Sequence, residues 1–280
     1  MKVCIIIPAH NEEAYLAQTL DSLCKQSHRP HQLIVVNDHS TDQTQAIIEQ
    51  FTQDYPFVHA LERTSTPDHQ PGSKVIQAFE AGLELLDTDY DVLCKYDADL
   101  IFPTHYLETL VDQFTQHSRW GIAGGFCTVE KNGSWEVENL TNTDHVRGAL
   151  KAYRKACFTA IGGLKTAMGW DTIDELLAQY HGWEVGTIPG LHVQHLKPTG
   201  ANYKKNAGYR QGRAFKQMRY GLLLGSIASA KLALKKRSFR YGWQCLRGLL
   251  TPTSNYLVTP EEGTFIRSLR WRNIRKKIAG

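Results

Sequence analysis

The sequence lacks the features that identify several protein classes. Its six cysteines are scattered, with no C-x-x-C pair and no other short paired spacing, which excludes a disulfide framework and a cysteine zinc site. No apolar run reaches the roughly 20 residues that a membrane-spanning helix needs, and the apolar run at residues 3–7 is too short for a signal peptide. Internal repeats and low-complexity tracts are also absent. These absences predict a cytosolic protein with reduced thiols and no export signal.

What the chain does contain is typical of a globular protein. It has 280 residues, of which 42% are hydrophobic, 21% charged and 10% aromatic, and this composition excludes collagen-like and wholly disordered classes. At about 150 residues per domain, the length predicts two domains or one large α/β unit with an appendage.

Acidic residues are almost missing from the C-terminal part. Residues 197–280 carry 19 Lys/Arg against two acidic residues (net +17), whereas residues 1–196 carry 13 Lys/Arg against 26 Asp/Glu (net −13). This division predicts that the basic part meets a polyanion, either nucleic acid or an anionic membrane surface. The apolar stretch at residues 222–234 is too short to span a bilayer and predicts an amphipathic interfacial helix, although a solvated basic face is the alternative.

Apolar periodicity predicts an α/β fold. Strand-like runs at residues 3–7, 33–36 and 91–96 alternate with helical patterns around 11–23, 46–51 and 75–86, which favours a mainly parallel sheet with helices on both faces. Further on, the pattern predicts strands at 122–129, 135–137 and 183–188 and helices at 151–161 and 171–180. We therefore expect a mixed sheet flanked by helices.

Carboxylates follow three of the predicted strands. Glu12 follows the first strand, Asp38 the second, and Asp97-Ala98-Asp99 the third. Ligands of open α/β sheets bind at the carboxyl ends of strands, and hard oxygen ligands suit Mg²⁺ or Mn²⁺, which would bridge to a diphosphate. A solvated turn is the alternative for Asp97 and Asp99.

Four polar segments occur in a fixed order along the chain: Ile6-Ile7-Pro8-Ala9-His10-Asn11-Glu12-Glu13, Val35-Val36-Asn37-Asp38-His39-Ser40-Thr41-Asp42, Gly72-Ser73-Lys74 and Asp97-Ala98-Asp99. Together they resemble the nucleotide-binding elements of family 2 glycosyltransferases with the GT-A fold, of the non-processive type. The resemblance covers about residues 2–200. It implies a GT-A domain at 1–200, with a nucleotide-sugar half (1–100) and an acceptor half (101–200), followed by a basic, aromatic-rich helical region at 201–280.

The resemblance also implies roles for single residues. Pro8, Ala9 and Glu12 would line the nucleotide pocket. Asp38 would hold the base, Lys74 would approach the base or the diphosphate, Asp97 would hold the ribose and help with the metal, and Asp99 would bind the metal. The chemistry agrees, because a diphosphate needs cations and a nucleoside needs acceptors for its N–H and hydroxyl groups. Asp42, just before a predicted helix, is better explained as a helix cap.

The acceptor half contains the candidate catalytic base. Residues 169–177 resemble the family's acceptor-side Glu-Asp motif, in which Asp174 matches the general base. Ile173 stands where Glu is usual, so Asp171 and Glu175 are alternative bases. An acidic first helical turn is the alternative interpretation, and it suits Asp171 better than all three together. Of two histidines three residues apart, His195 would complete the metal shell or contact the diphosphate, and His192 is assigned a structural role.

Together these features predict a Mg²⁺- or Mn²⁺-dependent inverting glycosyltransferase. Gln217-Met218-Arg219-Tyr220 does not match the Q-x-x-R-W motif of processive relatives, which favours transfer of a single sugar in cell-surface polysaccharide or glycolipid assembly. Expected partners are a nucleotide-diphospho-sugar, a saccharide or lipid-linked acceptor, and the inner face of the cytoplasmic membrane rather than nucleic acid. The alternatives are a non-catalytic nucleotide-binding scaffold and a sugar-phosphate nucleotidyltransferase, whose Gly-rich N-terminal loop is missing here.

Overall fold

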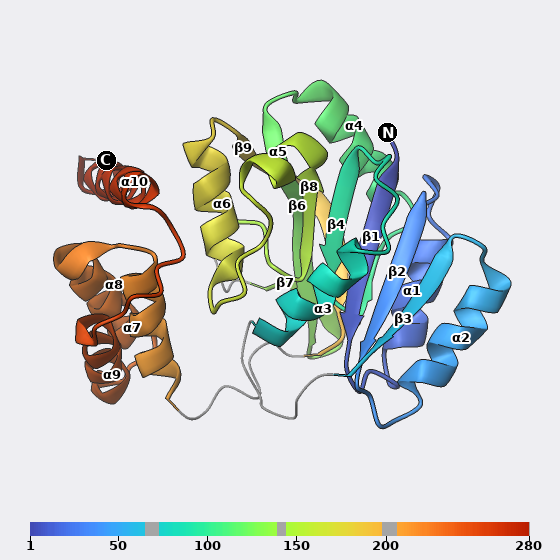
Figure 1. Ribbon diagram of the computed structural model, residues 1–280, viewed down its shortest axis with the longest axis horizontal. Helices are drawn as coiled ribbons and strands as arrows, with labels where there is room; N and C mark the ends of the chain where they lie inside the picture. Colours follow the sequence, from blue (N-terminus) through green and yellow to red (C-terminus); the bar gives the residue numbers. More distant parts are fainter. Residues whose placement is uncertain (65–72, 139–143, 198–205, 280) are drawn as a thin grey trace. The chain divides into compact units, whose positions relative to one another are not determined.

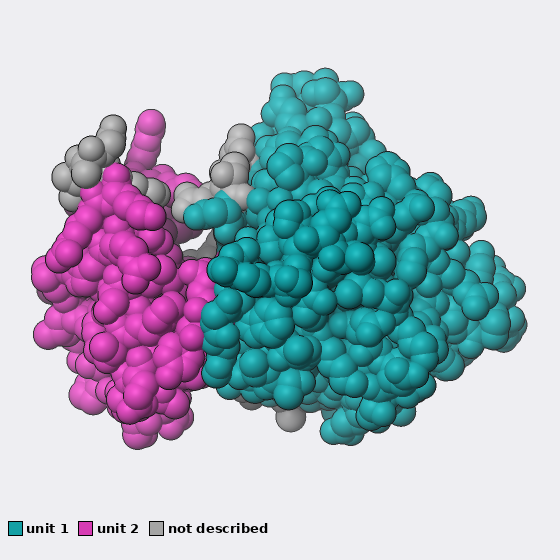
Figure 2. All heavy atoms as spheres, turned by 90° about the horizontal axis from the view of Figure 1, so that it is seen from above, with its two compact units in different colours: residues 1–166, 181–199 teal, residues 167–180, 200–280 magenta. Residues whose placement is uncertain are grey.

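The computed structural model describes residues 1–64, 73–138, 144–197 and 206–279 (Figure 1). The chain divides into two compact units, which are described separately below. The first comprises residues 1–166 and 181–199, and the second comprises residues 167–180 and 200–280 (Figure 2). Gly72, part of one predicted nucleotide-binding element, lies outside the described residues.

The first unit is a mixed sheet with helices. Its elements are β1 (Val3–Ala9), α1 (Leu16–Cys24), β2 (Gln32–Asp38), α2 (Thr44–Asp54), β3 (Val58–Arg63), α3 (Ser73–Leu83), β4 (Val92–Tyr96), β5 (Leu100–Ile101), α4 (Tyr106–Gln116), β6 (Trp120–Lys131), β7 (Ser134–Val137), β8 (Leu150–Arg154), α5 (Lys155–Ala160) and β9 (Glu184–His195). The strand order is β3-β2-β1-β4-β8-β6-β9-β5, with β7 paired to β6. This arrangement confirms the predicted mixed sheet flanked by helices.

The first four strands in this order are all parallel. β1 pairs with β2 and β4, and β2 pairs with β3. Residues 3–7 of β1 are fully buried, as expected of a central strand that is covered on both faces. Right-handed crossovers place α1 and α2 on one face and α3 on the other, because the chain reverses direction across the sheet between β3 and β4. Figure 1 shows α3 crossing in front of the strands.

One predicted helix is partly wrong. Residues 150–154 form the strand β8, antiparallel to β4 with Tyr153 opposite Leu93 and Ala152 opposite Cys94, and only Lys155–Ala160 is helical. The apolar spacing of residues 151–161 favours a helix, but hydrogen-bonded pairing with β4 stabilises residues 150–154 as a strand. Tertiary context here overrides local propensity. The strand predicted at 183–188 continues to His195, and β3, β5 and α4 were not anticipated from the sequence.

All the regular secondary structure in the described part of the second unit is helical. They are α6 (Trp170–Tyr180), α7 (Ala207–Gln217), α8 (Gly221–Lys235), α9 (Phe239–Leu250) and α10 (Pro260–Ala279). α7 and α9 approach closely at glycines: a Cβ on Gly212 would lie 1.9 Å from the carbonyl oxygen of Cys245. The ring of Tyr180 on α6 lies 5.5 Å from that of Phe265 on α10.

α8 differs from the amphipathic helix expected at residues 222–234. Apolar residues occupy its buried side, which includes Leu224, and also its exposed side, which includes Leu223 and Leu234. The expected pattern of one apolar and one polar face is therefore wrong for this helix. Over the part of the chain that the structure describes, no helix combines the length and the apolar character needed to cross a bilayer.

Candidate functional site

The sheet topology gathers the predicted site residues of the first unit at one edge. β2, β1 and β4 are parallel neighbours, so the segments that follow them lie side by side. β8 runs antiparallel to both β4 and β6, and β9 is parallel to β6, so β9 also ends at this edge. His195, the last residue of β9, consequently pairs with Leu100, next to Asp99.

The segment after β1 is held against the start of α2. The side-chain oxygen Oδ1 of Asn11 accepts a 2.8 Å hydrogen bond from the backbone N–H of Thr41, and the backbone N–H of Glu12 donates to Thr44 Oγ1 at 2.8 Å. Asn11 adopts a φ of 54°, a left-handed conformation that asparagine tolerates well. Pro8 and Ala9 thereby keep a fixed backbone at the strand end.

Asp42 performs the capping role. Its Oδ1 accepts hydrogen bonds from the backbone N–H (3.0 Å) and the hydroxyl (2.6 Å) of Thr44, and its Oδ2 accepts one from the backbone N–H of Glu13 (3.1 Å). Slight burial alone would raise the pKa of Asp42, but the hydrogen bonds from Thr44 and Glu13 outweigh it and lower the pKa. The carboxylate is therefore committed to holding two loops together.

Asp38, the predicted base-binding residue, is 5% exposed at the end of β2. Nη1 of Arg63 lies 3.3 Å from its Oδ1, and Nη2 of Arg63 lies 3.4 Å from Oε1 of Gln77 on α3. Lys74 precedes Gln77 by three residues, so both lie on the same side of α3. Arg63, which the sequence analysis did not identify, thus links Asp38 to the helix that carries Lys74.

Glu12 is paired with a second residue that the sequence analysis did not identify. Nζ of Lys197 lies 2.8 and 2.6 Å from the two carboxylate oxygens of Glu12, and 5.3 Å from the centre of the Tyr15 ring. Burial raises the pKa of Glu12; the Lys197 ammonium opposes this shift, and the charges of Asp99 and Asp97 add to it. Glu12 therefore belongs to the same electrostatic cluster as the two predicted metal-binding aspartates.

Asp97 is tied to the start of β8. Its carboxylate pairs with the ammonium of Lys95, whose Nζ also donates to the carbonyl of Gly148 at 3.1 Å. The backbone N–H of Asp97 donates to the carbonyl of Ala149 at 2.9 Å. Lys95 is 2% exposed, whereas the side chain of Asp97 is 36% exposed. Asp97 therefore pairs with a buried lysine on one side and is open to solvent on the other.

Asp99 lies deeper than Asp97 and faces His195. Nε2 of His195 lies 3.4 Å from Oδ2 of Asp99, and Nδ1 of His195 lies 3.6 Å from Oε2 of Glu138, which in turn pairs with Arg147. Oδ1 of Asp99 is buried and has no hydrogen-bond partner among the described residues. A buried carboxylate oxygen without a donor is costly unless a cation reaches it, so this geometry fits a divalent cation.

The cation would need ligands from outside this cluster. Among the residues that the structure describes, no three or more His, Cys, Asp and Glu side chains are arranged to hold a metal ion. Asp99, Asp97 and His195 are thus brought to one edge without forming a closed protein site. Such an incomplete shell suits a cation that shares its coordination with phosphate oxygens.

The candidate bases lie in the second unit. Asp174 (2% exposed) and Glu175 (7%) are buried on α6, and Asp171 in its first turn is partly exposed. Oδ1 of Asp174 accepts a 2.7 Å hydrogen bond from the backbone N–H of Glu175. This bond fixes the orientation of the Asp174 carboxylate. His192, which was assigned a structural role, lies on β9 of the first unit.

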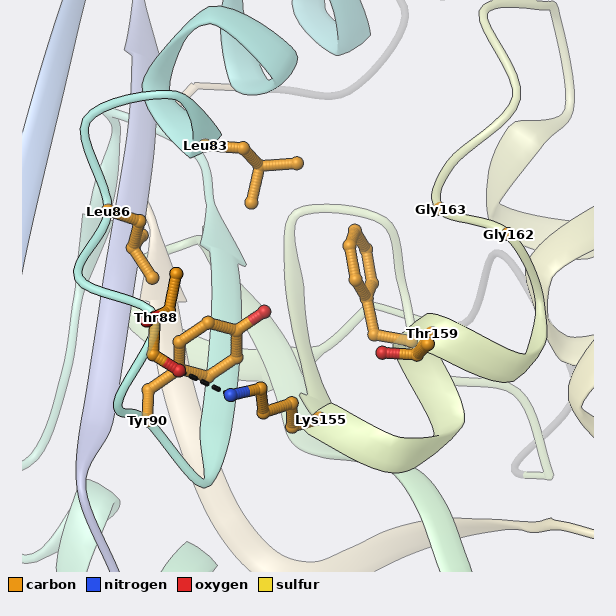
Figure 3. Close-up of a pocket in the computed structure, with 9 residues that line it drawn as sticks. Leu83, Leu86, Thr88, Tyr90, Lys155, Thr159, Gly162 and Gly163 are labelled. Carbon is orange, nitrogen blue, oxygen red and sulfur yellow. Dashed lines mark hydrogen bonds between the residues drawn. The ribbon is translucent and has the colours of Figure 1, made fainter.

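A separate hollow of about 400 Å³ does not coincide with these residues (Figure 3). It lies at the opposite end of β4, beside Tyr90 and Lys155. The Lys155 ammonium donates to the carbonyl of Thr88 and lies 4.8 Å from the centre of the Tyr90 ring. We assign it no part in the site, because it contains none of the strand-end carboxylates.

Comparisons with known proteins identify related sequences. The family model "Glycosyl transferase family 2" matches residues 4–159. The chain is 30% identical over 220 residues to beta-monoglucosyldiacylglycerol synthase of Synechocystis sp. (strain ATCC 27184 / PCC 6803 / Kazusa), covering 71% of this chain and 45% of that protein. The chain spans about half the length, or less, of the curated relatives that it matches.

Solved structures share the fold. The mannosyltransferase PcManGT from Pyrobaculum calidifontis, in complex with GDP-Man and Mn²⁺, superposes with a TM-score of 0.56 at 16% identity, over 96% of this chain and 75% of that one. Residues 1–349 of S. aureus TarS, in complex with UDP-GlcNAc, give a TM-score of 0.59 at 16% identity, over 89% and 72% of the two chains. At this level of identity the likeness establishes the fold.

Proposed function

The chain belongs to glycosyltransferase family 2, and from this membership we propose that it transfers a single sugar, with inversion, from a nucleotide-diphospho-sugar to a hydroxyl acceptor. The observation that carries the proposal is the gathering of Asp38, Asp97 and Asp99 at one edge of the sheet, inside the region that the family model matches. The fold is GT-A, shared with the nucleotide-sugar complexes described above.

The first unit would bind the donor. Asp38, oriented by Arg63, would accept the N–H of the base, and the open side of Asp97 would accept ribose hydroxyls. Lys74, one helical turn before the Arg63 partner Gln77 on α3, would neutralise part of the diphosphate charge. Pro8, Ala9 and Glu12 would form the wall of the pocket, with the Lys197 ammonium holding the Glu12 carboxylate in place.

The site fits Mn²⁺ or Mg²⁺. Asp99, with its buried donorless oxygen, would hold the cation, helped by Asp97 and His195, and the diphosphate would complete the shell. When bound, the cation supplies positive charge that stabilises the leaving diphosphate. Mn²⁺ accompanies GDP-Man in the Pyrobaculum mannosyltransferase, which supports this assignment.

Asp174 would act as the general base, with Asp171 and Glu175 as the alternatives. The acceptor hydroxyl would give its proton to the carboxylate while its oxygen forms the new bond to the anomeric carbon of the sugar. The bond from that carbon to the diphosphate breaks, and the nucleoside diphosphate leaves with the electron pair. A single displacement of this kind inverts the anomeric carbon.

We also propose a cytoplasmic enzyme that acts at the inner face of the cytoplasmic membrane in cell-surface polysaccharide or glycolipid assembly. The name of the Synechocystis relative states a glucosylated diacylglycerol as its product, which supports a lipid acceptor here. The net charge of +17 over residues 197–280 supports an anionic surface as the partner.

The test separates donor binding from chemistry. Purified protein is incubated with UDP-, GDP- and dTDP-sugars, with and without Mn²⁺ or Mg²⁺, while free nucleoside diphosphate is recorded and nucleotide affinity is measured by calorimetry. We expect metal-dependent release from one donor. Asp99→Ala and Asp174→Asn should each abolish release, and only Asp99→Ala should weaken metal-dependent nucleotide binding, by about tenfold or more.

Asp89→Ala serves as the matched control, because Asp89 is an exposed carboxylate of the same unit, paired with Lys2. It should leave both release and binding unchanged. Undiminished release by Asp174→Asn would exclude Asp174 as the base, and absence of binding to every donor would exclude the proposed roles of the strand-end carboxylates. Tight binding without release would leave two explanations, a missing acceptor or a non-catalytic scaffold.

A further inference from the structure

The second unit exposes two apolar stripes at helical spacing. On α8, Leu223, Ile227, Ala230 and Leu234 follow one another at intervals of four, three and four residues. On α9, Phe239, Trp243, Leu246 and Leu250 show the same intervals, which place each set along one side of its helix. Phe239 is 93% exposed, Leu234 75% and Trp243 70%.

Both stripes lie away from the packed sides of their helices. α9 meets α7 near Cys245 and Gly248 and meets α8 near Gly242 and Leu249, and its apolar stripe lies on neither of these sides. The contact pairs Gly225–Leu249 and Ala233–Gly242 show that α8 and α9 run antiparallel. In this antiparallel pair, the repeat of about 3.6 residues per turn places both stripes on the side that faces away from α7. α8 thus carries large apolar side chains on its packed side and also on its exposed side.

We propose that these two stripes form one docking face, which inserts into the interfacial region of an anionic lipid bilayer. Large exposed apolar patches on soluble domains mark interaction sites. Residues of α9 and Thr251 also line a shallow hollow of about 290 Å³ on this side, beside Trp243 and Leu250. The proposed docking face is therefore apolar and contains a shallow depression.

Charge identifies the occupant. The exposed cations on the two helices and their connection are Lys231, Lys235, Lys236, Arg237, Arg240 and Arg247. No acidic residue occurs anywhere between residues 197 and 260 of the sequence. Cations around an apolar face complement a surface that is negative at its rim and apolar inside, which is the layered structure of an anionic bilayer.

The turn between the helices is shaped as an insertion tip. Arg237 adopts a φ of 49° and Ser238 is extended, and the Ser238 hydroxyl caps α9 by accepting a 3.2 Å hydrogen bond from the backbone N–H of Tyr241. Phe239, the most exposed large apolar side chain of the chain's described part, follows this capping serine, which itself follows three consecutive cations. Lys236 lies over the Tyr241 ring, 5.1 Å from its centre, which holds the cation beside the tip.

This inference specifies the membrane partner proposed above, but its test does not depend on sugar transfer. Full-length protein is sedimented with vesicles of phosphatidylcholine alone or with about three-tenths phosphatidylglycerol. We expect binding to the anionic vesicles only, weakened about tenfold between 0.1 and 0.5 M salt because screening removes the electrostatic attraction. Phe239→Ser/Trp243→Ser should weaken it about tenfold or more, because two inserted aromatic groups are lost.

Two matched variants serve as controls. Leu85→Ser/Trp135→Ser removes two exposed large apolar side chains from the first unit and should leave vesicle binding unchanged. Lys231→Gln/Lys236→Gln/Arg237→Gln should weaken binding, whereas Lys25→Gln/Arg119→Gln/Lys131→Gln, with the same change in charge, should not. Circular dichroism and thermal unfolding verify that every variant folds.

Fluorescence quenching tests directly whether Trp243 enters the bilayer. Brominated acyl chains should quench part of the tryptophan fluorescence of the bound wild-type protein, and Trp243→Phe should still bind but lose that part of the quenching. Three results would overturn the proposal: equal binding to neutral and anionic vesicles, binding that survives Phe239→Ser/Trp243→Ser, or a solution dimer that this variant disrupts without any vesicle binding. None of these results requires a loss of nucleotide-sugar turnover, so failure here is distinct from failure of the proposed activity.

Discussion

At the scale of single residues, the donor site depends on ion pairs that join distant parts of the sequence. Glu12 was predicted from its position after β1, but its partner Lys197 is 185 residues away in the chain. Arg63 and Glu138, partners of Asp38 and His195, are likewise invisible to spacing arguments. Carboxylates after strands can be found from sequence because strand ends converge. The cations that pair with them follow from the tertiary fold.

Asp42 provides a residue-scale prediction, because capping and nucleotide binding have different consequences. Asp42→Ala should destabilise the protein by about 1 kcal/mol, the usual cost of a lost helix cap, and leave nucleotide affinity unchanged. Hydrogen bonds lower the pKa of Asp42 in the folded state, so its stabilising effect is present above the ordinary carboxyl pKa near 4 and is lost as the pH falls through the lowered value. Urea unfolding of both proteins at pH 7 and pH 3 measures the difference.

The gap between wild type and Asp42→Ala should be largest at pH 7 and shrink at pH 3. Asp54→Ala is the matched control, because Asp54 is the last residue of the same helix, where a negative charge does not favour the helix dipole. It should not destabilise the protein. A loss of nucleotide affinity in Asp42→Ala, with stability unchanged, would contradict the capping role and assign Asp42 to the donor site.

At the scale of elements, the sequence predicted the parallel strands well and the β8 region poorly. Buried parallel strands are continuous apolar runs bounded by turns, so residues 3–7, 33–36 and 91–96 were recognisable. In β8, Lys151 and Arg154 flank a central alanine and tyrosine, and the segment becomes a strand only because β4 and β6 lie on either side of it. Lys151 is buried directly opposite Lys95, an arrangement that no alternation pattern predicts.

The helices of the second unit pack through glycines, and this gives an element-scale prediction. A Cβ on Gly212 of α7 would lie 1.9 Å from the Cys245 carbonyl, and one on Gly248 of α9 would lie 2.1 Å from the Tyr209 carbonyl. Both neighbours are backbone atoms, which cannot rotate away. Gly212→Ala should therefore destabilise the second unit by about 1–3 kcal/mol, in spite of the higher helix propensity of alanine.

Limited proteolysis and hydrogen exchange over α7 and α9 would measure this effect locally. Arg210→Ala is the matched control, because Arg210 is exposed on the same helix. Its exchange pattern should resemble that of the wild type. Unchanged protection of α7 and α9 in Gly212→Ala would show that the two helices are not as close as the glycines indicate.

At the scale of the whole molecule, charge and fold divide the chain in nearly the same way. The acidic residues 1–196 supply the mixed sheet with its carboxylate edge, and the basic residues after 197 supply helices α7–α10. The division into compact units differs in one segment, because residues 167–180, which carry Asp174, belong to the second unit. The sequence placed this segment in the acceptor half on the strength of its motif, and no composition signal distinguishes it from its neighbours.

If the two units have separate tasks, variants in one should leave the task of the other intact. Asp99→Ala should weaken metal-dependent nucleotide binding about tenfold or more and leave affinity for anionic vesicles within twofold of wild type. Phe239→Ser/Trp243→Ser should do the reverse, because the two sets of residues belong to different compact units and independent sites act additively. Calorimetry with UDP or GDP and vesicle sedimentation on the same protein preparations give both numbers. A variant that weakens both kinds of binding would show that donor site and bilayer face are energetically coupled, and would replace the picture of two independent units by one of membrane-controlled donor binding.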